Sequence, residues 1–312
     1  MKTELAQEII HCLPEDRTLF HYYKDYYAVY LLQREIMSAG IDQVAQLKRC
    51  RYANLTAKPV IKSLLANRGS GEISAEDFET LWSDDYETYV LTLGSWGQTK
   101  DDGYFQTSRP GTNIVLQLNF SRRHDQRYRR CFGDELDLFS FSSHPISPHK
   151  TTLAWARIDL DFNTDEALIE EIQNDWLRRF NDFMWDFRYA VKQGHLSFDY
   201  YGMNVYVDRA FEYYQYEIKP QQDIWSEAML SATLKFLLDE IGIKTVYYHS
   251  DVTGAAMKRI HFGKPPRSLY SKLPNQFCFN RVTDAPAFLA KDKSARRRLR
   301  KIKNQQWFRM ET

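Results

Sequence analysis

The chain has 312 residues, of which 27% are charged and 43% hydrophobic, and its formal net charge at pH 7 is +1. This length allows a large core in one or two domains, and the balanced charge excludes a global field that attracts nucleic acid or a membrane. No stretch is long enough for a membrane-spanning helix, the N-terminus lacks a signal-peptide core, and the four cysteines lack the spacing of a zinc or redox motif. We therefore expect a cytoplasmic protein with free thiols.

The first 82 residues are predicted to be helical. Apolar side chains recur there at spacings of three and four residues in segments that begin near Asp16, Ile41, Pro59 and Ser74. Aspartate is a frequent N-cap, proline suits a first turn, and Ser74 with Asp77 resembles a capping box. Strands are predicted next, at residues 86–93 and 113–120, where β-branched and aromatic residues are frequent.

The loop between these two strands has a polar group that could bind a ligand, made of Trp96, Gln106, Thr107, Ser108 and Arg109. A charged segment at 122–130 follows the second strand. It is followed by SFSSHPISPHK at 140–150, whose serines and prolines predict a linker and a domain boundary. His144 and His149 flank the prolines of this segment, and either a solvated loop or metal ligation can account for them.

Residues 153–162 and 167–173 are predicted to form a β-hairpin, with a helix over 176–191 after it. The second strand leads into the helix through the sequence EEIQNDW. This segment resembles EEIQSDW, which recurs in the large polyvalent proteins of phages and conjugative elements, where a Trp-led helix, a strand and a Thr-Gly turn also follow. The resemblance covers about residues 151–260 and implies a shared fold.

Three interpretations of the acidic hairpin remain open. Glu171 and Gln173 lie on one polar face, which can pair structurally with Arg157 across the hairpin. Alternatively, Asp161 and Glu171 resemble the two carboxylates with which restriction-endonuclease-like nucleases hold Mg²⁺ at a scissile phosphate, and Gln173 replaces the usual lysine. In the third interpretation, these side chains act as a base or substrate clamp in another transfer reaction.

The most regular stretch of the sequence follows. We expect, in chain order, strands at 198–207 and 211–218, a helix at 225–241, a strand at 245–248 and a second helix beginning near Thr253. In folds that alternate strands and helices, ligands bind where strands end and helices begin. The functional site is therefore expected at the turns of this stretch.

This order of strand, turn, helix, strand and helix resembles the central part of the GCN5-related N-acetyltransferase fold. In that family a turn and a helix N-terminus hold the pyrophosphate of acetyl-CoA. The resemblance implies that Gln221 and Gln222 in the first turn, and Thr253 and Gly254 in the second, bind the cofactor. The first turn reads KPQQD, so it lacks the family's glycines, and Asp223 there would repel phosphate.

His249 ends the predicted strand at 245–248, and Asp251 follows in the next turn. Because an unperturbed imidazole titrates near neutrality, His249 beside Asp251 is the best candidate for a general acid or base. Capping of the next helix by Ser250 or Asp251 is the structural alternative.

The C-terminal region begins with a proline-rich segment, 264–274, which is predicted to be an extended strap. The segment 291–303 has eight basic residues and one acid, and like charges at helical spacing destabilise a helix unless a partner neutralises them. Nucleic acid is the partner that this pattern predicts, with Trp307 and Phe308 available for base stacking. The expected phosphate contacts are Arg296, Arg297, Arg298, Arg300, Lys301 and Lys303.

Together these predictions describe an α+β protein with a helical N-terminal part and a mixed β-sheet with an N-acetyltransferase-like core. Its expected parts are residues 1–140, an acetyltransferase-like domain at 151–290 and a basic tail at 291–312. The first functional hypothesis is an acyl or group-transfer enzyme, with acetyl-CoA as its cofactor. The second is a nucleic-acid-binding protein or Mg²⁺-dependent nuclease, and the third a non-enzymatic module of mobile-element conflict. No membrane partner is expected.

Overall fold

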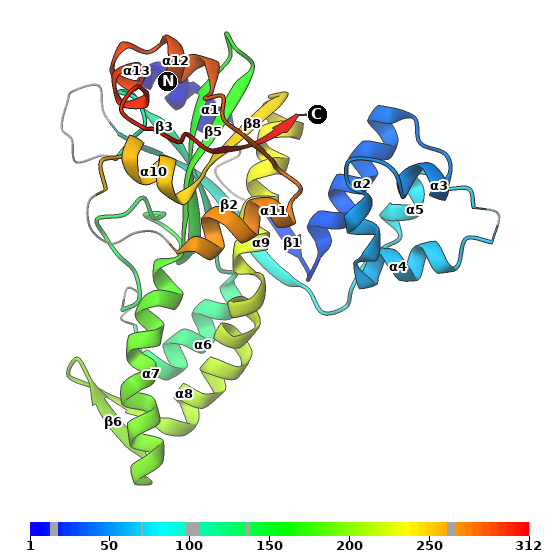
Figure 1. Cartoon of the computed structure of the whole chain (residues 1–312). Helices are drawn as coiled ribbons and strands as arrows, with labels where there is room; N and C mark the ends of the chain where they lie inside the picture. The colour runs from blue at the N-terminus through cyan, green and yellow to red at the C-terminus, as the bar shows by residue number, and fades with distance from the viewer. Residues whose placement is uncertain (13–17, 70, 98–105, 135–137, 261–265, 312) are drawn as a thin grey trace.

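The computed structural model describes the chain apart from residues 13–17, 70, 98–105, 135–137, 261–265 and 312. Its main feature is a mixed eight-stranded sheet with helices on both faces, which confirms the predicted α+β class (Figure 1). A lobe of short helices lies beside the sheet, and an arm of longer helices extends away from it.

The strand order in the sheet is β1-β2-β3-β4-β5-β8-β10-β9. The strands are β1 (Thr18–Tyr22), β2 (Glu87–Trp96), β3 (Asn113–Asn119), β4 (Thr152–Asp161), β5 (Glu166–Gln173), β8 (Thr245–His249), β9 (Asn280–Val282) and β10 (Trp307–Glu311). Neighbouring strands are antiparallel except β5 and β8, which run parallel. A parallel pair needs a long crossover, and the helices between β5 and β8 supply it.

Helices cover the two faces of the sheet. On one face α9 (Lys219–Lys235) crosses β3, β4 and β5, where the fully buried Ala154 and Ala156 leave room for it. On the other face Leu168, Tyr247 and Trp307 pack against a second group of helices, formed by α10 (Asp251–Met257), α12 (Ala287–Lys291) and α13 (Lys293–Leu299). The central strands β5 and β8 are therefore covered on both faces.

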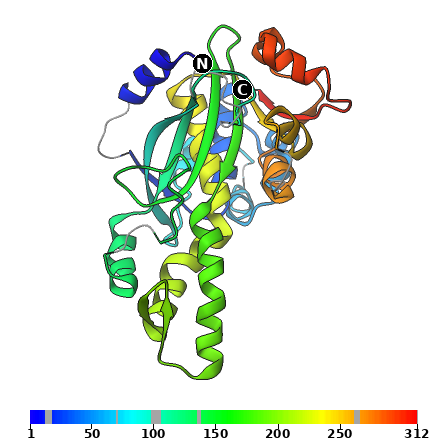
Figure 2. The same ribbon diagram turned by 90° about the vertical axis from the view of Figure 1, so that its left-hand side faces the viewer.

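The remaining helices form the N-terminal helix, the lobe and the arm. The N-terminal helix is α1 (Thr3–Cys12). The lobe contains α2 (Tyr26–Ala39), α3 (Val44–Leu47), α4 (Pro59–Ala66) and α5 (Glu76–Glu79). A further short helix, α11 (Leu273–Gln276), precedes β9 in the chain. The arm contains α6 (Arg122–Phe132), α7 (Asp175–Gln193), α8 (Val207–Tyr213) and the hairpin of β6 (Ser197–Tyr200) and β7 (Met203–Tyr206). In Figure 2 the arm extends below the sheet, with this hairpin near its tip.

Several predicted elements are confirmed. The hairpin of β4 and β5, the helix α7 that follows it, and the strands β2, β3 and β8 occupy the predicted ranges to within a few residues. In the lobe, α3 and α4 lie inside two of the predicted helical segments. These elements have strong local periodicity, which tertiary contacts reinforce rather than override.

Two predictions about the N-terminal half are wrong. The helix expected from Asp16, a residue outside the described part of the chain, is replaced by β1 and by α2, which starts only at Tyr26. In β1 the buried Phe20 and Tyr22 alternate with more exposed residues, a period of two. The boundary expected at 140–150 separates β3 from β4, yet these strands are hydrogen-bonded neighbours. The segments on either side of it therefore share one sheet.

The segment 211–218 is helical, so the strand predicted there is wrong. Residues 207–240 form one nearly continuous helical stretch in which π-helical turns at Tyr214–Ile218 and Phe236–Glu240 flank α9. The first π-helical turn directly precedes Pro220, which lacks the N–H that a regular helix needs. Aromatic residues suggested a strand, but the buried positions Ala210, Tyr213 and Glu217 follow helical spacing.

The C-terminal predictions also need correction. Part of the proline-rich segment is helical, with a π-helical turn at Ser268–Lys272 that continues into α11, where Pro274 occupies a first turn. The region 291–312 is not a separate tail, because β10 lies between β8 and β9 in the sheet. Trp307 and Phe308 are in β10 and only 0% and 2% exposed, so neither can stack on a base.

Candidate active site

A cavity opens where β5 and β8 part. The parallel pairing joins Glu166–Ile169 to Thr245–Tyr248 and then stops, while β5 continues to Gln173. Beyond this point lies a cavity of about 790 Å³, which we call the β5 cavity. Its walls come from the end of β5, the first turns of α7 and α9 and the segment before α11, and the residues that line it include Gln106, His144, Glu171, Gln173, Asn174, Arg178, Gln222, Trp225 and Tyr270.

A β-bulge in β5 places two neighbouring carboxylates on one side of the strand. Arg157 is paired with Glu171 and Ile158 with Ile169, so Glu170 has no partner residue on β4. A bulge of this kind redirects side chains that would otherwise alternate between the faces of a sheet. Both glutamates consequently reach the same buried cluster of charged and polar groups, next to the β5 cavity.

Glu171 is neutralised by two buried cations. Arg157 donates a hydrogen bond to its carboxylate, and Lys258 Nζ lies 3.4 Å from Oε2. Burial alone would raise the pKa of Glu171, but the charges of Lys258 and Arg157 outweigh this effect and lower it to about 2. Pairing of Glu171 with Arg157 across the hairpin, the structural interpretation of this segment, is therefore confirmed.

His249 is fully buried in the same cluster. Its Nε2 lies 2.8 Å from Ser108 Oγ and 3.1 Å from Glu170 Oε2, while Nδ1 has no hydrogen-bond partner among the described residues. Burial lowers the pKa of His249, so the ring is neutral near pH 7. In a catalytic triad the nucleophile and the carboxylate contact opposite nitrogens of the histidine ring. Here Ser108 and Glu170 both contact Nε2. The geometry fits a structural role that ties the 106–112 loop to β5 and β8.

A different histidine has the geometry of a general base. His144 Nδ1 lies 2.7 Å from the Asp175 carboxylate, which also accepts hydrogen bonds from Trp155 Nε1 at 3.1 Å, Gln173 Nε2 at 2.6 Å and Arg178 at 2.7 Å. Burial raises the pKa of Asp175, but the hydrogen bonds and charge of His144 outweigh this and lower it. An ionised carboxylate only accepts, so Nδ1 carries a proton, and in the neutral form of the ring Nε2 holds the lone pair.

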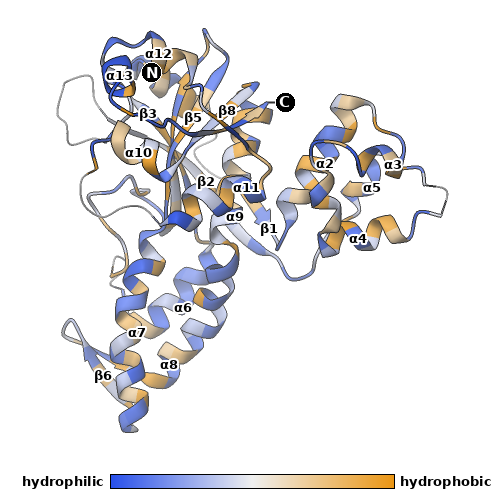
Figure 3. Cartoon of the chain, in the orientation of Figure 1, coloured by the Kyte–Doolittle hydropathy of each residue, from blue (hydrophilic) through white to orange (hydrophobic). Residues whose placement is uncertain are grey.

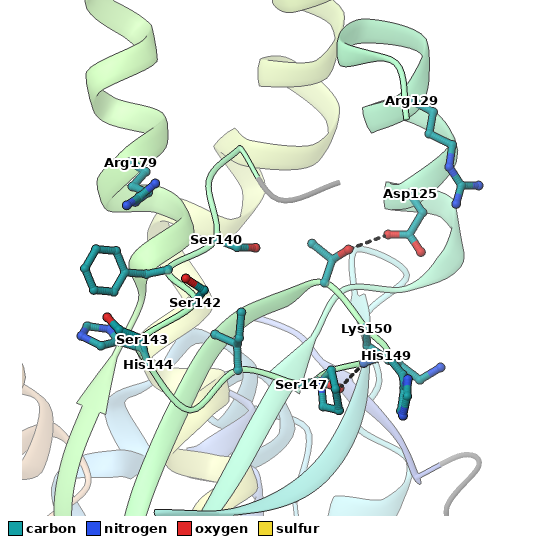
Figure 4. A pocket seen from close by; sticks show the side chains of 14 residues that line it. Asp125, Arg129, Ser140, Ser142, Ser143, His144, Ser147, His149, Lys150 and Arg179 are labelled. Carbon is teal, nitrogen blue, oxygen red and sulfur yellow. Dashed lines mark hydrogen bonds between the residues drawn. The ribbon is translucent and has the colours of Figure 1, made fainter. Parts of the chain in front are cut away.

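His144 also lines a second cavity, of about 780 Å³, between the 140–151 loop, α6 and α7 (Figure 4). We call it the loop cavity. Its remaining lining residues include Asp125, Arg129, Ser140, Phe141, Ser142, Ser143, Ser147, His149, Lys150 and Arg179. Among the described residues, His144 is the single one that lines both cavities. Its side chain is 25% exposed, so it remains accessible from them.

The structure separates the predicted site residues into two groups. Glu171, Gln173 and Gln222 all line the β5 cavity. Gln221 does not, because it is buried inside α9 and accepts a hydrogen bond from Tyr89 at 2.5 Å. The turn in which Gln221 and Gln222 were expected to bind acetyl-CoA does not exist, since residues 219–223 belong to the helix.

The residues predicted around α10 hold the fold together. Ser250 caps α10 by accepting from the Thr253 N–H, which confirms the capping alternative. Thr253 Oγ1 in turn accepts from the Gln306 N–H at 3.0 Å. A Cβ on Gly254 would lie 3.0 Å from the Cβ of His249, so this glycine allows α10 to approach β8 closely. The Asp251 carboxylate points instead toward Arg267, at 3.8 Å, and not to the histidine it was expected to assist.

The prediction of a nuclease site formed by two carboxylates is wrong. Asp161 is paired with Glu166 in the hairpin, and it accepts a hydrogen bond from Arg109 at 3.1 Å. Glu171 lies near the other end of β5, next to Arg157. Among the described residues, no group of three His, Cys, Asp or Glu side chains is arranged to hold a metal ion. The register of the hairpin therefore keeps these two carboxylates apart.

Comparisons with known proteins identify no relative. No family model matches the chain, and neither the curated proteins nor the solved structures contain a match. In the described part of the chain, no helix combines the length and apolar character that crossing a bilayer requires.

Proposed function

We propose that this protein is a group-transfer enzyme in which His144 acts as the general base. The observation that carries the proposal is a histidine oriented by a buried carboxylate, at the one place where the two cavities share a lining residue. A transfer reaction needs two substrates, and two cavities that share one base can hold them. The many convergent polar groups also disfavour the third hypothesis, a module without enzymatic activity.

The reaction that fits this arrangement is acyl transfer from a thioester to an amine or hydroxyl group. His144 Nε2 would take the proton of the nucleophile as it attacks the acyl carbon. The new bond joins the nucleophile to the acyl group, the C–S bond breaks, and the thiolate leaves and takes up a proton. Asp175 would stabilise the imidazolium that forms, as the carboxylate does in hydrolase triads.

The expected result of the deciding experiment is a large loss of rate in His144→Asn. Asparagine keeps a polar group near Asp175 but cannot accept a proton, and general-base catalysis typically contributes about 10²–10⁴-fold in rate. The measurement is thiol release from acetyl-CoA and longer acyl thioesters in the presence of pooled amines and alcohols. His195→Asn is the matched control, because His195 is exposed and lines neither cavity.

Two outcomes would contradict this proposal. One is the absence of acceptor-dependent thiol release from every thioester with the wild-type protein. The other is a rate in His144→Asn equal to that of His195→Asn. A loss of rate in His144→Asn that comes with partial unfolding would point to a disturbed loop, and circular dichroism with a thermal melt of each variant separates that case from lost catalysis.

A second candidate function, nucleic-acid binding, is supported by the exposed basic side chains around α13. Arg298 is an exception, because it donates to the carbonyl oxygens of Thr107 at 2.9 Å and Met257 at 2.8 Å and so belongs to the fold. The exposed residues are Lys291, Lys293, Arg296, Arg297, Arg300, Lys301 and Lys303. None of these seven forms an ion pair with another described residue, and α13 is largely hydrophilic in Figure 3.

For this second candidate we expect the triple variant Arg296→Gln/Arg297→Gln/Arg300→Gln to weaken binding to a labelled DNA or RNA duplex. If all three contact phosphates, the slope of log K against log salt becomes shallower by about 0.9 for each DNA phosphate contact. Fluorescence anisotropy at several salt concentrations measures both quantities. Deletion of residues 291–312 is unsuitable, because it would remove the core strand β10.

The matched control for the triple variant removes three exposed cations from the arm, Arg122, Arg188 and Lys192. Equal weakening in both triple variants would indicate attraction to net charge alone, and it would contradict a specific surface at α13. Absence of salt-dependent binding in the wild-type protein would also reject this second function.

A further inference from the structure

The loop cavity has an excess of positive charge. Three cationic side chains line it, Arg129, Arg179 and Lys150, against a single carboxylate, Asp125. The Asp125 carboxylate already has local partners, because its Oδ1 lies 3.2 Å from both Thr151 Oγ1 and His124 Nδ1. The cations are therefore available to an anion that enters the cavity.

Two guanidinium groups stand on opposite sides of this cavity, Arg129 on α6 and Arg179 on α7 (Figure 4). The Arg179 guanidinium carbon lies 4.8 Å from the centre of the Phe141 ring, which restricts its orientation. No ion pair joins Arg179 to another described residue. Among the described residues, the one ion pair of Arg129 is a long contact with a fully exposed carboxylate, Asp134 at 3.7 Å. Such a surface pair contributes little and can be displaced by a ligand.

Hydroxyl groups line the cavity between these cations. Ser140, Ser142 and Ser143 come from the loop, and their hydroxyls make no hydrogen bond with another described residue. Guanidinium groups with hydroxyl donors are a typical environment for phosphate, since guanidinium groups form paired hydrogen bonds to its oxygens. A volume of about 780 Å³ is in the range of small-molecule sites rather than of a surface for a polymer.

We infer that the loop cavity binds a phosphate-bearing small molecule, held between Arg129 and Arg179 with the loop serines as further donors. The role of this molecule in the reaction rests on the proposed group transfer. In that reaction the phosphate-bearing molecule is the substrate whose reacting group reaches His144. The β5 cavity would then accept the second substrate. This assignment places one substrate in each of the two cavities that share His144.

The test is isothermal titration calorimetry of the full chain with inorganic pyrophosphate and with ADP as probes. We expect both to bind, and we expect Arg179→Gln and Arg129→Gln each to weaken binding by about 10-fold or more, as loss of a charge-assisted hydrogen bond does. The matched controls are Arg188→Gln on α7 and Arg122→Gln on α6. Both are exposed and line neither cavity. These controls should leave the affinity within about twofold of the wild-type value.

The inference is overturned if neither probe binds the wild-type protein, or if the control variants lose as much affinity as the cavity variants. His144→Asn separates this test from that of the proposed function, since it should abolish transfer without weakening ADP binding. Specific binding without any transfer activity would leave the anion site established and reject the enzyme. Transfer whose KM is unchanged in Arg179→Gln would keep the enzyme and reject the anion site.

Discussion

Replacing Arg157 by methionine is expected to lower the free energy of unfolding by about 3–5 kcal/mol. Arg157 is 2% exposed and bonds to the Glu171 carboxylate and to the Gln106 carbonyl oxygen at 3.3 Å. Methionine fills much of the same volume but leaves Glu171 with Lys258 as its remaining cation. The cost is large because the Glu171 carboxylate is only 14% exposed, so the surrounding medium replaces little of the lost charge. Chemical denaturation at pH 7 measures the change.

The pH dependence of this loss has a definite sign. The folded-state pKa of Glu171, about 2, lies below its ordinary value of 4.5, so its ionised form stabilises the fold above about pH 4.5. That contribution disappears as the pH falls through the folded-state pKa. The difference between wild-type protein and Arg157→Met should therefore be largest near neutral pH and shrink between about pH 5 and pH 2.

Arg123→Met is the control for this variant. Arg123 is also paired with a carboxylate, Glu87 at 3.3 Å, but its side chain is 56% exposed. Exposed pairs contribute at most about 1 kcal/mol. Removing both partners, in Arg157→Met/Glu171→Met, should restore part of the stability. A cost below about 1 kcal/mol in Arg157→Met would show that the buried pair is not formed.

Replacing Trp176 by alanine is expected to destabilise the protein by about 3–5 kcal/mol. Trp176 ends the EEIQNDW segment and starts the arm, and its side chain is 1% exposed. It packs in an aromatic cluster formed by Phe120, His124, Tyr128 and Phe139, whose ring centres lie 5.3–5.6 Å from its own. Its Nε1 also donates to Tyr213 Oη at 3.2 Å. The substitution therefore leaves a cavity and removes a buried hydrogen bond.

A thermal melt should show a decrease in Tm of several degrees for Trp176→Ala. Trp185→Ala tests the same helix without the packing, because Trp185 is 74% exposed, and its effect should stay within about 0.5 kcal/mol. Similar small effects of both substitutions would mean that Trp176 does not join the arm to the sheet. A large effect of Trp185→Ala alone would reverse the assignment of the buried face of α7.

The elements with a strong local pattern could be predicted. The β4–β5 hairpin has a recognisable turn and a run of buried residues in each strand, and α7 and β8 have equally clear periodicity. The Ser250 cap joins residues three positions apart, so it could also be predicted from the sequence. The prediction from the local sequence is wrong at 211–218. Aromatic residues there favour a strand, whereas long-range packing against the sheet and arm favours a helix.

The candidate base could not be predicted in the same way. His144 stands in a Ser- and Pro-rich loop, and its sequence neighbours contain no carboxylate. Asp175 lies 31 positions away, and the two meet because the loop folds back over the end of β5, where α7 begins. The nearest signal in the sequence is Asp175, one of the three acidic residues of EEIQNDW. Nothing in its spacing specified which histidine it would orient.

By itself, the sequence determined the α+β class and the positions of the β4–β5 hairpin, α7 and β8, because these depend on periodicity and on a short hairpin. Only the tertiary structure decided which groups form the site. The bulge at Glu170, the parting of β5 from β8 and the position of the 140–151 loop each depend on contacts between segments far apart in the chain. Such contacts reflect the packing of the whole core, and a local pattern of residues does not encode them.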